Sequence, residues 1–540
     1  MGWCPYRGCG LAECSDGYPD STGAGERGVS GGEAAHPAVP PHPAAPPRSA
    51  SPRRGKVLSF AAAALWLAVW QLASWAVAQP LLLPGPVEVA RALVALATEP
   101  AFWGKVGFSA ARITGGCALA YAAALLLAAA SRASGAFEVL VRPPLVAIKS
   151  TPVACFVVLL LMWLGASNVS MAAVSLMALP GVYFPALEGL TGVDAGRLEM
   201  LRVHGVRGAR RLLALTWPEA LPFLLAASKT VLGMSWKSGV AAELIGMPLG
   251  SIGERIYQAK LLLDTPSLFA WTLVVIALAT VWERACLWLL RASGPAAIRL
   301  AVRLRPRGEA ELGFGVAARS GFCPGGTGGA VEAGDDLPGG VPEPGADASR
   351  GAIVADGLVL PHGAAGGWPV LLSVVPGGRL CLMGPSGVGK TTLLRVLEGL
   401  ETPISSERLE VPARISVEFQ DARLIEGASA FANCALVAAP DRSDAEIRRL
   451  LERAIPGIDP CVSVSELSGG QRRRVELVRA LLAPGDCIIL DEPFAGLDDG
   501  AHAAVCSLVR SELRGRSLVI ATHDARDAGL LGAAVYHVGT

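Results

Sequence analysis

Long uninterrupted apolar runs fill the chain between Val57 and Leu290, whereas from about Ala352 the apolar runs become shorter and alternate with helical patterns. A run of about 20 apolar residues is long enough to cross a hydrocarbon core about 30 Å thick. The first region therefore predicts membrane-spanning helices. Short apolar strands that alternate with helices are typical of an α/β domain, which we expect in the second region.

Hydropathy alone predicts five membrane spans. They are Val57–Ala78, Ile113–Ser131, two spans within the charge-free stretch between Lys149 and Glu188, broken near residues 165–168, and Pro266–Leu290. A sixth apolar segment, Ala220–Ile245, contains Lys229, Lys237 and Glu243. Charged groups inside a membrane usually face a bundle interior or a water-filled path. Two interpretations are therefore open for Lys149, Lys237 and Glu243. They line a substrate path, or they pair with one another or lie near the interface, and we favour the second interpretation.

Composition and charge narrow the class of protein. Of the 540 residues, 52% are hydrophobic and only 17% are charged, against about 25% in soluble domains. The net charge of +1 gives no support for a nucleic-acid partner. The 12 cysteines are scattered and do not form a disulfide framework. Residues 1–52 and 306–351 are rich in Gly and Pro, which predicts a disordered N-terminal segment and a flexible linker.

The segment Gly384–Thr391 matches the phosphate-binding pattern G-x-x-x-x-G-K-[ST] at every fixed position. Backbone N–H groups of such a loop form a nest for phosphate oxygens, and a following helix presents its N-terminus to them. Lys390 is expected to reach the β- and γ-phosphates of ATP, and the Thr391 hydroxyl to ligate Mg²⁺. The expected ATP-binding residues of this loop are Gly384, Pro385, Ser386, Gly387, Val388, Gly389, Lys390, Thr391 and Thr392.

An ATP-binding loop belongs in the cytoplasm, and this requirement sets the number of spans. Arg53, Arg54 and Lys56 precede the first span and place the N-terminus inside. An odd number of spans would put the loop outside, so Ala220–Ile245 is counted as a span. Five arginines then lie between the fourth and fifth spans, five more follow the sixth, and both clusters fall inside. We expect a multi-pass protein of the cytoplasmic membrane with both termini in the cytoplasm.

Further motifs follow the phosphate-binding loop in a fixed order. They are Phe419-Gln420-Asp421, Leu467-Ser468-Gly469-Gly470-Gln471, an apolar strand ending in Asp491-Glu492, Ala495-Gly496-Leu497-Asp498, and a strand ending in Thr522-His523. The set resembles the ATP-binding cassette of ABC transporters over residues 352–540, and the LSGGQ stretch is its diagnostic part. Taken singly, each piece is also explained by a solvated strand end or a structural histidine, but the joint order favours the cassette.

The resemblance implies a role for each position. Asp491 would hold Mg²⁺ through water, and Glu492 would be the general base that polarises the attacking water. His523 would contact the γ-phosphate, and Gln420 would sense Mg²⁺ and the γ-phosphate. The positions expected at the seam between two subunits, where they close over the partner's nucleotide, are Ser468, Gly469, Gly470, Gln471 and Asp498. The adenine contact is left open between His362 and Trp368.

The segment between the fourth and fifth spans carries a second resemblance. It reads Glu199-Met200-Leu201, then three residues, then Gly205, and reaches Trp217-Pro218 with the spacing of the EAA loop of ABC importer permeases. Met200 and Leu201 replace the two alanines of that pattern. We expect a short cytoplasmic helix that ends at Gly205 in the left-handed conformation and docks on a partner domain, with Glu199, Gly205 and Asp498 as coupling residues. An ordinary basic loop is the alternative.

Together these features predict an α-helical transmembrane bundle of about six spans (residues 53–305) followed by an α/β P-loop cassette (residues 352–540). The resemblance implies an importer with permease and ATPase in one chain, working as a homodimer through both regions with a separate extracytoplasmic substrate-binding protein. Short segments near residues 83, 150 and 236 look like permeases of the nitrate/sulfonate/taurine type, which suggests a small organic anion or nitrate as solute. An ABC exporter and a membrane-tethered regulatory ATPase are the alternatives.

Overall fold

A computed structural model of the chain describes residues 52–79, 81–306, 351–361, 367–497 and 499–539. The chain divides into two compact units, Met1–Ala68 and Val69–Thr540, and the boundary falls inside helix α1 (Pro52–Val77). All elements from α2 onward belong to the second unit. The expected disordered N-terminal segment and nearly all of the expected linker lie outside the described residues.

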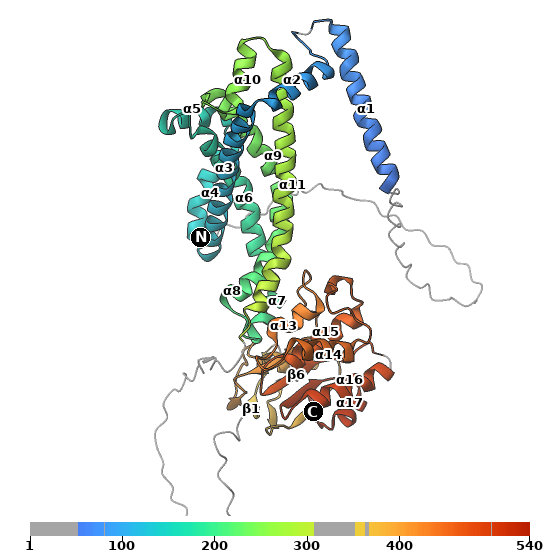
Figure 1. The fold of residues 1–540 in the computed structure, drawn as a ribbon. Helices are drawn as coiled ribbons and strands as arrows, with labels where there is room; N and C mark the ends of the chain where they lie inside the picture. The colour runs from blue at the N-terminus through green and yellow to red at the C-terminus, as the bar shows by residue number, and fades with distance from the viewer. Residues whose placement is uncertain (1–51, 80, 307–350, 362–366, 498, 540) are drawn as a thin grey trace, which may run out of the picture. The chain divides into compact units, whose positions relative to one another are not determined.

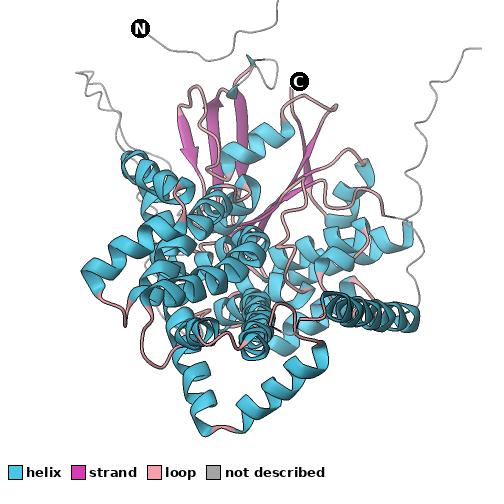
Figure 2. Ribbon diagram, turned by 90° about the horizontal axis from the view of Figure 1, so that it is seen from above, coloured by secondary structure: helices cyan, strands magenta, loops and turns pink. Residues whose placement is uncertain are grey.

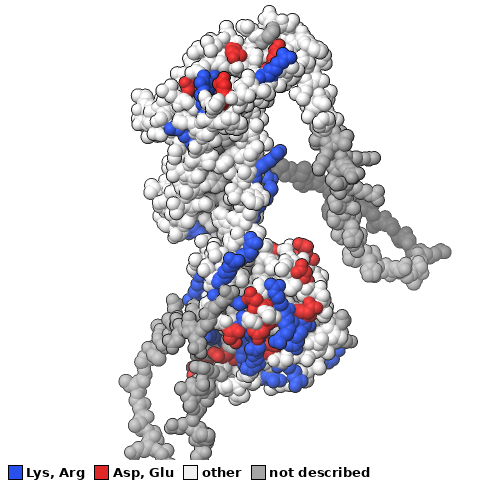
Figure 3. All heavy atoms as spheres, in the orientation of Figure 1, with Lys and Arg blue, Asp and Glu red and all other residues white. Residues whose placement is uncertain are grey.

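Every regular element described before residue 306 is a helix (Figure 1). After α1 they are α2 (Pro86–Thr98), α3 (Pro100–Ala133), α4 (Gly135–Ser150), α5 (Val153–Leu164), α6 (Val169–Thr191), α7 (Ala195–Val203), α8 (Gly208–Arg211), a π-helical turn (Leu212–Thr216), α9 (Trp217–Gly246), α10 (Ile252–Leu261) and α11 (Thr265–Arg303). Helices α3, α6, α9 and α11 pack in that order. Figure 3 shows that most of the surface over these helices is free of charged side chains.

Among the described residues, four helices are long and apolar enough to cross a membrane: α1 from Phe60 onward, α3, α6 and α11. Helices α4 and α5 meet this standard only as a pair, which would make a fifth. Helix α9 corresponds to the predicted span Ala220–Ile245 and has 30 residues, but it does not meet the same standard. Four of its side chains are charged, which lowers its hydropathy. The predicted helical region is therefore confirmed, and six spans require both α9 and the bent pair.

The prediction of two spans between Lys149 and Glu188 was wrong in one respect. The break at residues 165–168 is present, and α6 after it is long enough to span. Helix α5 before it has only 12 residues, and it is bent by 108° from α4. The cause is Pro152, because a proline disfavours the helical conformation of the residue before it. Thr151 is accordingly extended (φ −89°, ψ 134°), so α5 crosses only together with α4 or re-enters.

Small residues let the central helices approach closely. A Cβ atom added at Gly116 of α3 would lie 2.5 Å from the main-chain oxygen of Met171 in α6. One added at Gly189 of α6 would lie 2.8 Å from the Cα atom of Ala220 in α9. These contacts leave no room for a side chain, so glycine at these positions sets the distance between α3, α6 and α9.

The described strands all follow residue 351 and form two sheets (Figure 2). The smaller sheet is antiparallel, in the order β2 (Val370–Val374), β1 (Ile353–Leu358), β4 (Arg408–Glu410). The larger sheet is parallel, in the order β5 (Ile415–Glu418), β6 (Cys487–Asp491), β7 (Ser517–Ala521), β3 (Arg379–Met383), β8 (Ala534–His537). The predicted α/β fold of this region is thus confirmed.

Both faces of the parallel sheet are buried, which explains why its strands read as continuous apolar runs. Leu382, Ile489 and Val519 join one core with helix α12 (Lys390–Leu397). Alternate residues such as Ile488 and Ile520 face a second core. The helices of this second core are α13 (Ala430–Val437), α14 (Asp444–Ala454), α15 (Gly469–Leu482), α16 (Asp499–Glu512) and α17 (Ala525–Leu531).

Replacing Gly116 with alanine should lower the stability of the helical region, because the added methyl group overlaps the backbone of α6. Overpacking of this kind costs about 1–3 kcal/mol. The matched control is Gly107→Ala on the same helix, where nothing lies within 4 Å of the new Cβ atom. Thermal unfolding of the purified chain in detergent should show a lower Tm for the first variant only. Equal Tm values would contradict the close packing of α3 against α6.

Candidate functional site

The parallel sheet brings four separate motifs to one edge. The carboxyl ends of parallel strands meet at the same edge of a sheet, where α/β proteins bind ligands. Strand β3 leads into the phosphate-binding loop, β6 ends at Asp491 before Glu492, and β7 leads to His523. Gln420 follows β5, the neighbour of β6. The residues predicted from the sequence for phosphate binding and hydrolysis therefore lie along one edge.

The phosphate-binding loop has the conformation that its glycines permit. Gly387 has φ +82° and Gly389 has φ +108°, a region that residues with a side chain rarely adopt. Gly389 is also the residue before helix α12, whose first N–H groups point toward the loop. The Lys390 ammonium is buried inside the loop and donates hydrogen bonds to the main-chain oxygens of Gly384 (2.7 Å) and Pro385 (3.2 Å). The loop is thus a nest of donors with one cation.

Asp491 and Thr391 form a polar pair beside this loop. The Thr391 hydroxyl donates to Oδ2 of Asp491 at 2.9 Å, and Arg473 donates to the main-chain oxygen of Asp491. Burial, and secondarily the charge of Glu492, raises the pKa of the Asp491 carboxyl. A hydroxyl and a carboxylate are ligands that Mg²⁺ accepts, and a cation between them would offset the buried negative charge. The two residues therefore fit the metal that the sequence predicts.

Glu492 and His523 lie at the tips of adjacent strands. Glu492 has φ +52°, which is unusual for a residue with a side chain, and its N–H donates to the oxygen of Ala521 on β7. Backbone strain of this kind is common at active sites. One carboxylate oxygen of Glu492 lies 3.9 Å from Nδ1 of His523, whose side chain is 69% exposed. Both groups can therefore reach a molecule in front of the sheet edge.

The LSGGQ residues form the exposed start of helix α15. Ser468 is its N-cap and makes a reciprocal capping box with Gln471: the Ser468 N–H donates to Oε1 of Gln471, and the Gln471 N–H donates to the Ser468 hydroxyl. Nothing lies within 4 Å of a Cβ atom added at Gly469 or Gly470. Within the described part of the chain, no hydrogen bond joins these residues to the phosphate-binding loop. Asp498 and His362 lie outside the described residues, and Trp368 is exposed.

Comparison with known proteins assigns both regions. Residues 120–291 match the family model of binding-protein-dependent transport system inner membrane components, and residues 369–495 match the ABC transporter model. The chain is 38% identical to the aliphatic sulfonates import ATP-binding protein of Granulibacter bethesdensis, over 30% of this chain and 68% of that protein. It is 38% identical to the thiamine import ATP-binding protein of a Jannaschia species, over 29% of this chain and 76% of that protein. This chain belongs to the ABC transporter family.

A solved structure of an ABC transporter ATP-binding protein from Pyrococcus furiosus covers 35% of this chain and 97% of its own length, with 20% identity and a TM-score of 0.30. The family assignment rests on the sequence relatives. The transporter thus has a membrane permease region and an ATPase coupled to transport in one chain.

The transporter holds its Gln420 segment through residues that sequence reasoning missed. Arg423 follows Gln420 by three positions, and its main chain is bonded twice to helix α15. Its N–H donates to Glu476 at 2.5 Å, and its oxygen accepts from Arg479 at 2.7 Å. Glu476 and Arg479 are buried and pair with each other at 3.3 Å. An acid and a base three positions apart in the otherwise apolar second half of α15 were the available signal.

The side chain of Arg423 connects the cassette to the permease. Its guanidinium stacks on Phe419, with 3.8 Å from Cζ to the ring centroid, and donates to Glu199 of α7 at 3.0 Å. Arg395 of α12 lies 3.6 Å from the same carboxylate. Glu199, predicted as a coupling residue, therefore lies between two cassette arginines.

Helix α7 is the short helix predicted from the EAA-like spacing. It ends one residue before His204, and Gly205 follows in the left-handed conformation with φ +71°. Met200 and Leu201 are 1% and 0% exposed and belong to the same hydrophobic core as Leu436 of α13. Burial lowers the pKa of His204 to about 4, so this ring is neutral near pH 7. Helix α7 is therefore docked on the cassette through apolar side chains.

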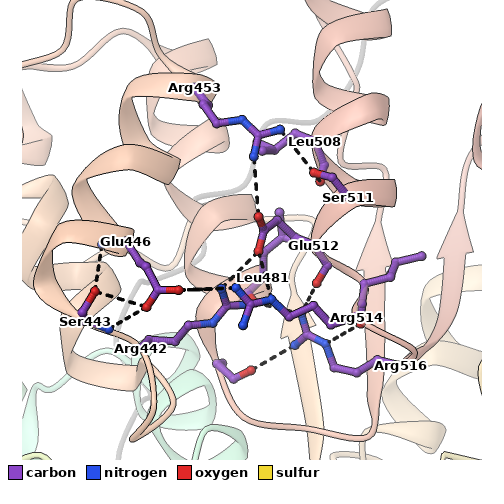
Figure 4. Close-up of polar contacts among 12 residues, drawn as sticks. Arg442, Ser443, Glu446, Arg453, Leu481, Leu508, Ser511, Glu512, Arg514 and Arg516 are labelled. Carbon is purple, nitrogen blue, oxygen red and sulfur yellow. Dashed lines mark hydrogen bonds and ion pairs between the residues drawn. The ribbon is translucent and has the colours of Figure 1, made fainter.

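A second contact joins the last permease helix to the cassette. Arg305, just after α11, is buried and donates to Asp444 of α14 (2.7 Å) and to the main-chain oxygen of Arg442 (3.2 Å). Figure 4 shows that the Arg442 guanidinium donates a hydrogen bond to Glu512 at the end of α16. Arg453 and Arg514 lie on the same carboxylate. This cluster links α11 to the helix that follows the predicted dimer-seam residue Asp498.

A buried hydrogen-bonded chain positions the segment around His523. Nε2 of His502 lies 2.6 Å from one oxygen of Asp527, and the Thr522 hydroxyl donates to the other oxygen at 2.5 Å. The ligand atoms of His502, Cys506 and Asp527 all lie within 4.8 Å of one another, as in a metal site. The hydrogen bond between His502 and Asp527 already occupies two of those atoms. We therefore interpret the group as a structural support.

The variant Glu492→Gln should bind ATP but hydrolyse it slowly, because an amide keeps the shape of the side chain and cannot accept the proton of water. Loss of a general base typically costs about 10²–10⁴-fold in rate. Phosphate release and binding of a fluorescent ATP analogue measure the two effects separately. The control is Glu410→Gln on β4, which is exposed and outside the site. Normal turnover by the first variant would exclude Glu492 as the base.

Proposed function

We propose that this chain is half of an ABC importer that uses ATP to carry a small solute into the cytoplasm. The observation that supports this most directly is helix α7, which leaves the permease region, buries Met200 and Leu201 in the cassette core and pairs Glu199 with Arg423. A helix with the EAA spacing in this position is what an importer permease needs in order to follow its ATPase. The match of residues 120–291 to binding-protein-dependent permeases points the same way.

The proposed chemistry follows from the sheet edge. Lys390 and the loop N–H groups bind the phosphates of ATP, and His523 contacts the γ-phosphate. Glu492 accepts a proton from the attacking water, and Gln420 senses the nucleotide. Thr391 and Asp491 would hold Mg²⁺, which would neutralise charge that develops on the phosphates. All of these residues lie at the carboxyl edge of the parallel sheet, so one nucleotide can contact them together.

The proposed working unit is a homodimer. The start of α15 is exposed, and within the described residues it makes no hydrogen bond to its own phosphate-binding loop. Its N-terminus is suited to an anion, so it would close on the nucleotide of a second copy, with Asp498 at the seam. The match of the permease region further suggests a separate extracytoplasmic binding protein that delivers the solute. The cassette and both termini would then lie in the cytoplasm.

Uptake by reconstituted vesicles tests the direction of transport. The full chain is placed in liposomes that contain ATP and Mg²⁺, and the solute and purified binding proteins encoded near the gene are added outside. We expect accumulation of solute that requires both ATP and a binding protein. Export from loaded vesicles without a binding protein would favour an exporter. Hydrolysis that no solute or binding protein changes would favour a tethered regulatory ATPase.

The ion pair between Glu199 and Arg423 should couple movements of the cassette to the permease region. Removing it with Arg423→Ala or Glu199→Gln should leave ATP hydrolysis within a few-fold of normal and lower uptake about tenfold, since hydrogen bonds to charged groups contribute about 1.5–3 kcal/mol. The double variant should be no worse than either single one. Arg202→Gln, on the exposed face of α7, serves as the control. Equal loss of hydrolysis and uptake would contradict a coupling role.

A further inference from the structure

Helix α9 carries two lysines on one exposed face. Lys229 and Lys237 are exposed, and so are Ala226, Thr230 and Met234 between or beside them. Their spacing of three or four residues places them on a single stripe of the helix. The other side of α9, which includes Leu232 and Gly239, is packed against α3 and α6. The lysines thus point away from the core of their own chain.

The contacts of α9 with α6 fix the depth of these lysines. A Cβ atom added at Gly181 would lie 2.7 Å from Val231, so Val231 is level with the middle of α6. Lys229 is two positions away and Lys237 is six, which is about 3 Å and about 9 Å along a helix that rises 1.5 Å per residue. Helix α6 is itself long and apolar enough to span. Both lysines therefore lie within the hydrocarbon depth of the bundle.

The three ionisable residues singled out in the sequence have different environments. Glu243 is fully buried, and its carboxylate accepts hydrogen bonds from Ser109 of α3 (2.7 Å) and from the N–H of Gly253 (3.3 Å). Lys149 lies 5.8 Å from the ring centroid of Phe184. Lys237 makes no hydrogen bond or ion pair with any described residue, and the same holds for Lys229. No two of them pair with each other, so of the alternative favoured from the sequence only a position near the interface remains.

An ammonium at this depth cannot face lipid without a large cost, about 2.5–3.5 kcal/mol or more at the centre of a bilayer. A lysine side chain reaches about 6 Å, whereas Lys229 is more than 10 Å from either surface of a 30 Å core. It therefore cannot place its charge at the interface by extending along the helix. Lys237 lies nearer a surface, but at the depth of Lys229 the stripe needs water or a polar partner in front of it.

We propose that Lys229 and Lys237 of two copies of this chain line one shared aqueous path and bind an anionic solute on its way through. The inference rests on the proposed transport by a homodimer and names the substrate class of that path. The exposed stripe of α9 contains no acidic residue, because Glu243 is turned into the core and Glu219 pairs with Arg197 near the start of the helix. Exposed apolar neighbours such as Met234 (54%) and Phe223 (38%) supply the contact surface for the second copy.

The charge of the path is tested by thiol labelling of the variant Lys237→Cys in the full chain, held in lipid nanodiscs. Two methanethiosulfonate probes are used, one carrying a sulfonate and one a trimethylammonium group, with mass spectrometry of the peptide around residue 237. After correction for rates on free cysteine, we expect the sulfonate probe to react about tenfold faster, because unit charges about 10 Å apart in a partly hydrated site interact by this order. The added change Lys229→Gln should reduce the preference.

A control on the lipid-facing surface shows whether the labelling reports an aqueous path. Leu126→Cys, on the exposed surface of α3 (72%), should react slowly with both probes because it faces lipid. Equal rates of the two probes at position 237, or no reaction at all, would overturn the anionic path. Neither measurement needs ATP or uptake. A protein that keeps the sulfonate preference but fails to transport would count against the proposed importer alone.

The second copy is tested by oxidising Met234→Cys in membranes. A disulfide-linked product of twice the mass of this chain is expected, because the two stripes face each other across the path. The control variant Leu126→Cys should give none. A linked product of any other mass would overturn a second copy as the partner of this face. The same conclusion would follow if no linked product formed although position 237 reacts with both probes.

Discussion

The main chain of residue 423 is held on both sides by the helix that begins with LSGGQ, and its side chain leaves the cassette to meet Glu199. These contacts lie in a buried cluster, where Glu418 has no exposed surface and its pKa is raised well above the usual range by burial and by the charge of Glu476. Breaking one charged contact in such a place leaves a buried ion without a partner, which is costly. The elements that carry the cluster are therefore expected to move as a unit, and the permease helix α7 moves with them.

The parallel sheet supplies the other requirement, which is a fixed edge. The strands β3, β6 and β7 are buried on both faces, so their carboxyl ends hold the loop, Asp491 and His523 at constant separation. The segment after β5 differs, since Gln420 is exposed, whereas Arg423 three positions later is hydrogen-bonded to α15. A rigid edge with one adjustable neighbour is a suitable arrangement for reporting whether nucleotide is present.

The set of residues that meet at the sheet edge could be predicted from the sequence because phosphate binding needs particular residues at particular spacings. The fold class and the end of α7 at Gly205 were predictable for similar local reasons. Three other contacts were not predictable, because each joins residues that only tertiary packing brings together. They are Arg423 with Glu476, Arg305 with Asp444, and His502 with Asp527. Hydropathy also missed the short α5, since it measures the length of an apolar run and not the bend that Pro152 puts into it.

The size of Met200 and Leu201 has a consequence for assembly. The EAA pattern has alanine at both positions, and a cassette surface shaped for alanine would have no space for two larger side chains. In this chain both side chains are fully buried, in a core that contains cassette residues together with residues of the helical region such as Val206 and Leu215. A permease with this helix is therefore matched to its own cassette by shape, and exchange with the cassettes of other transporters in the same cell would be disfavoured by steric overlap. Covalent fusion of the two regions allows this specific match of shapes to be kept, since the permease region and its cassette are always made together.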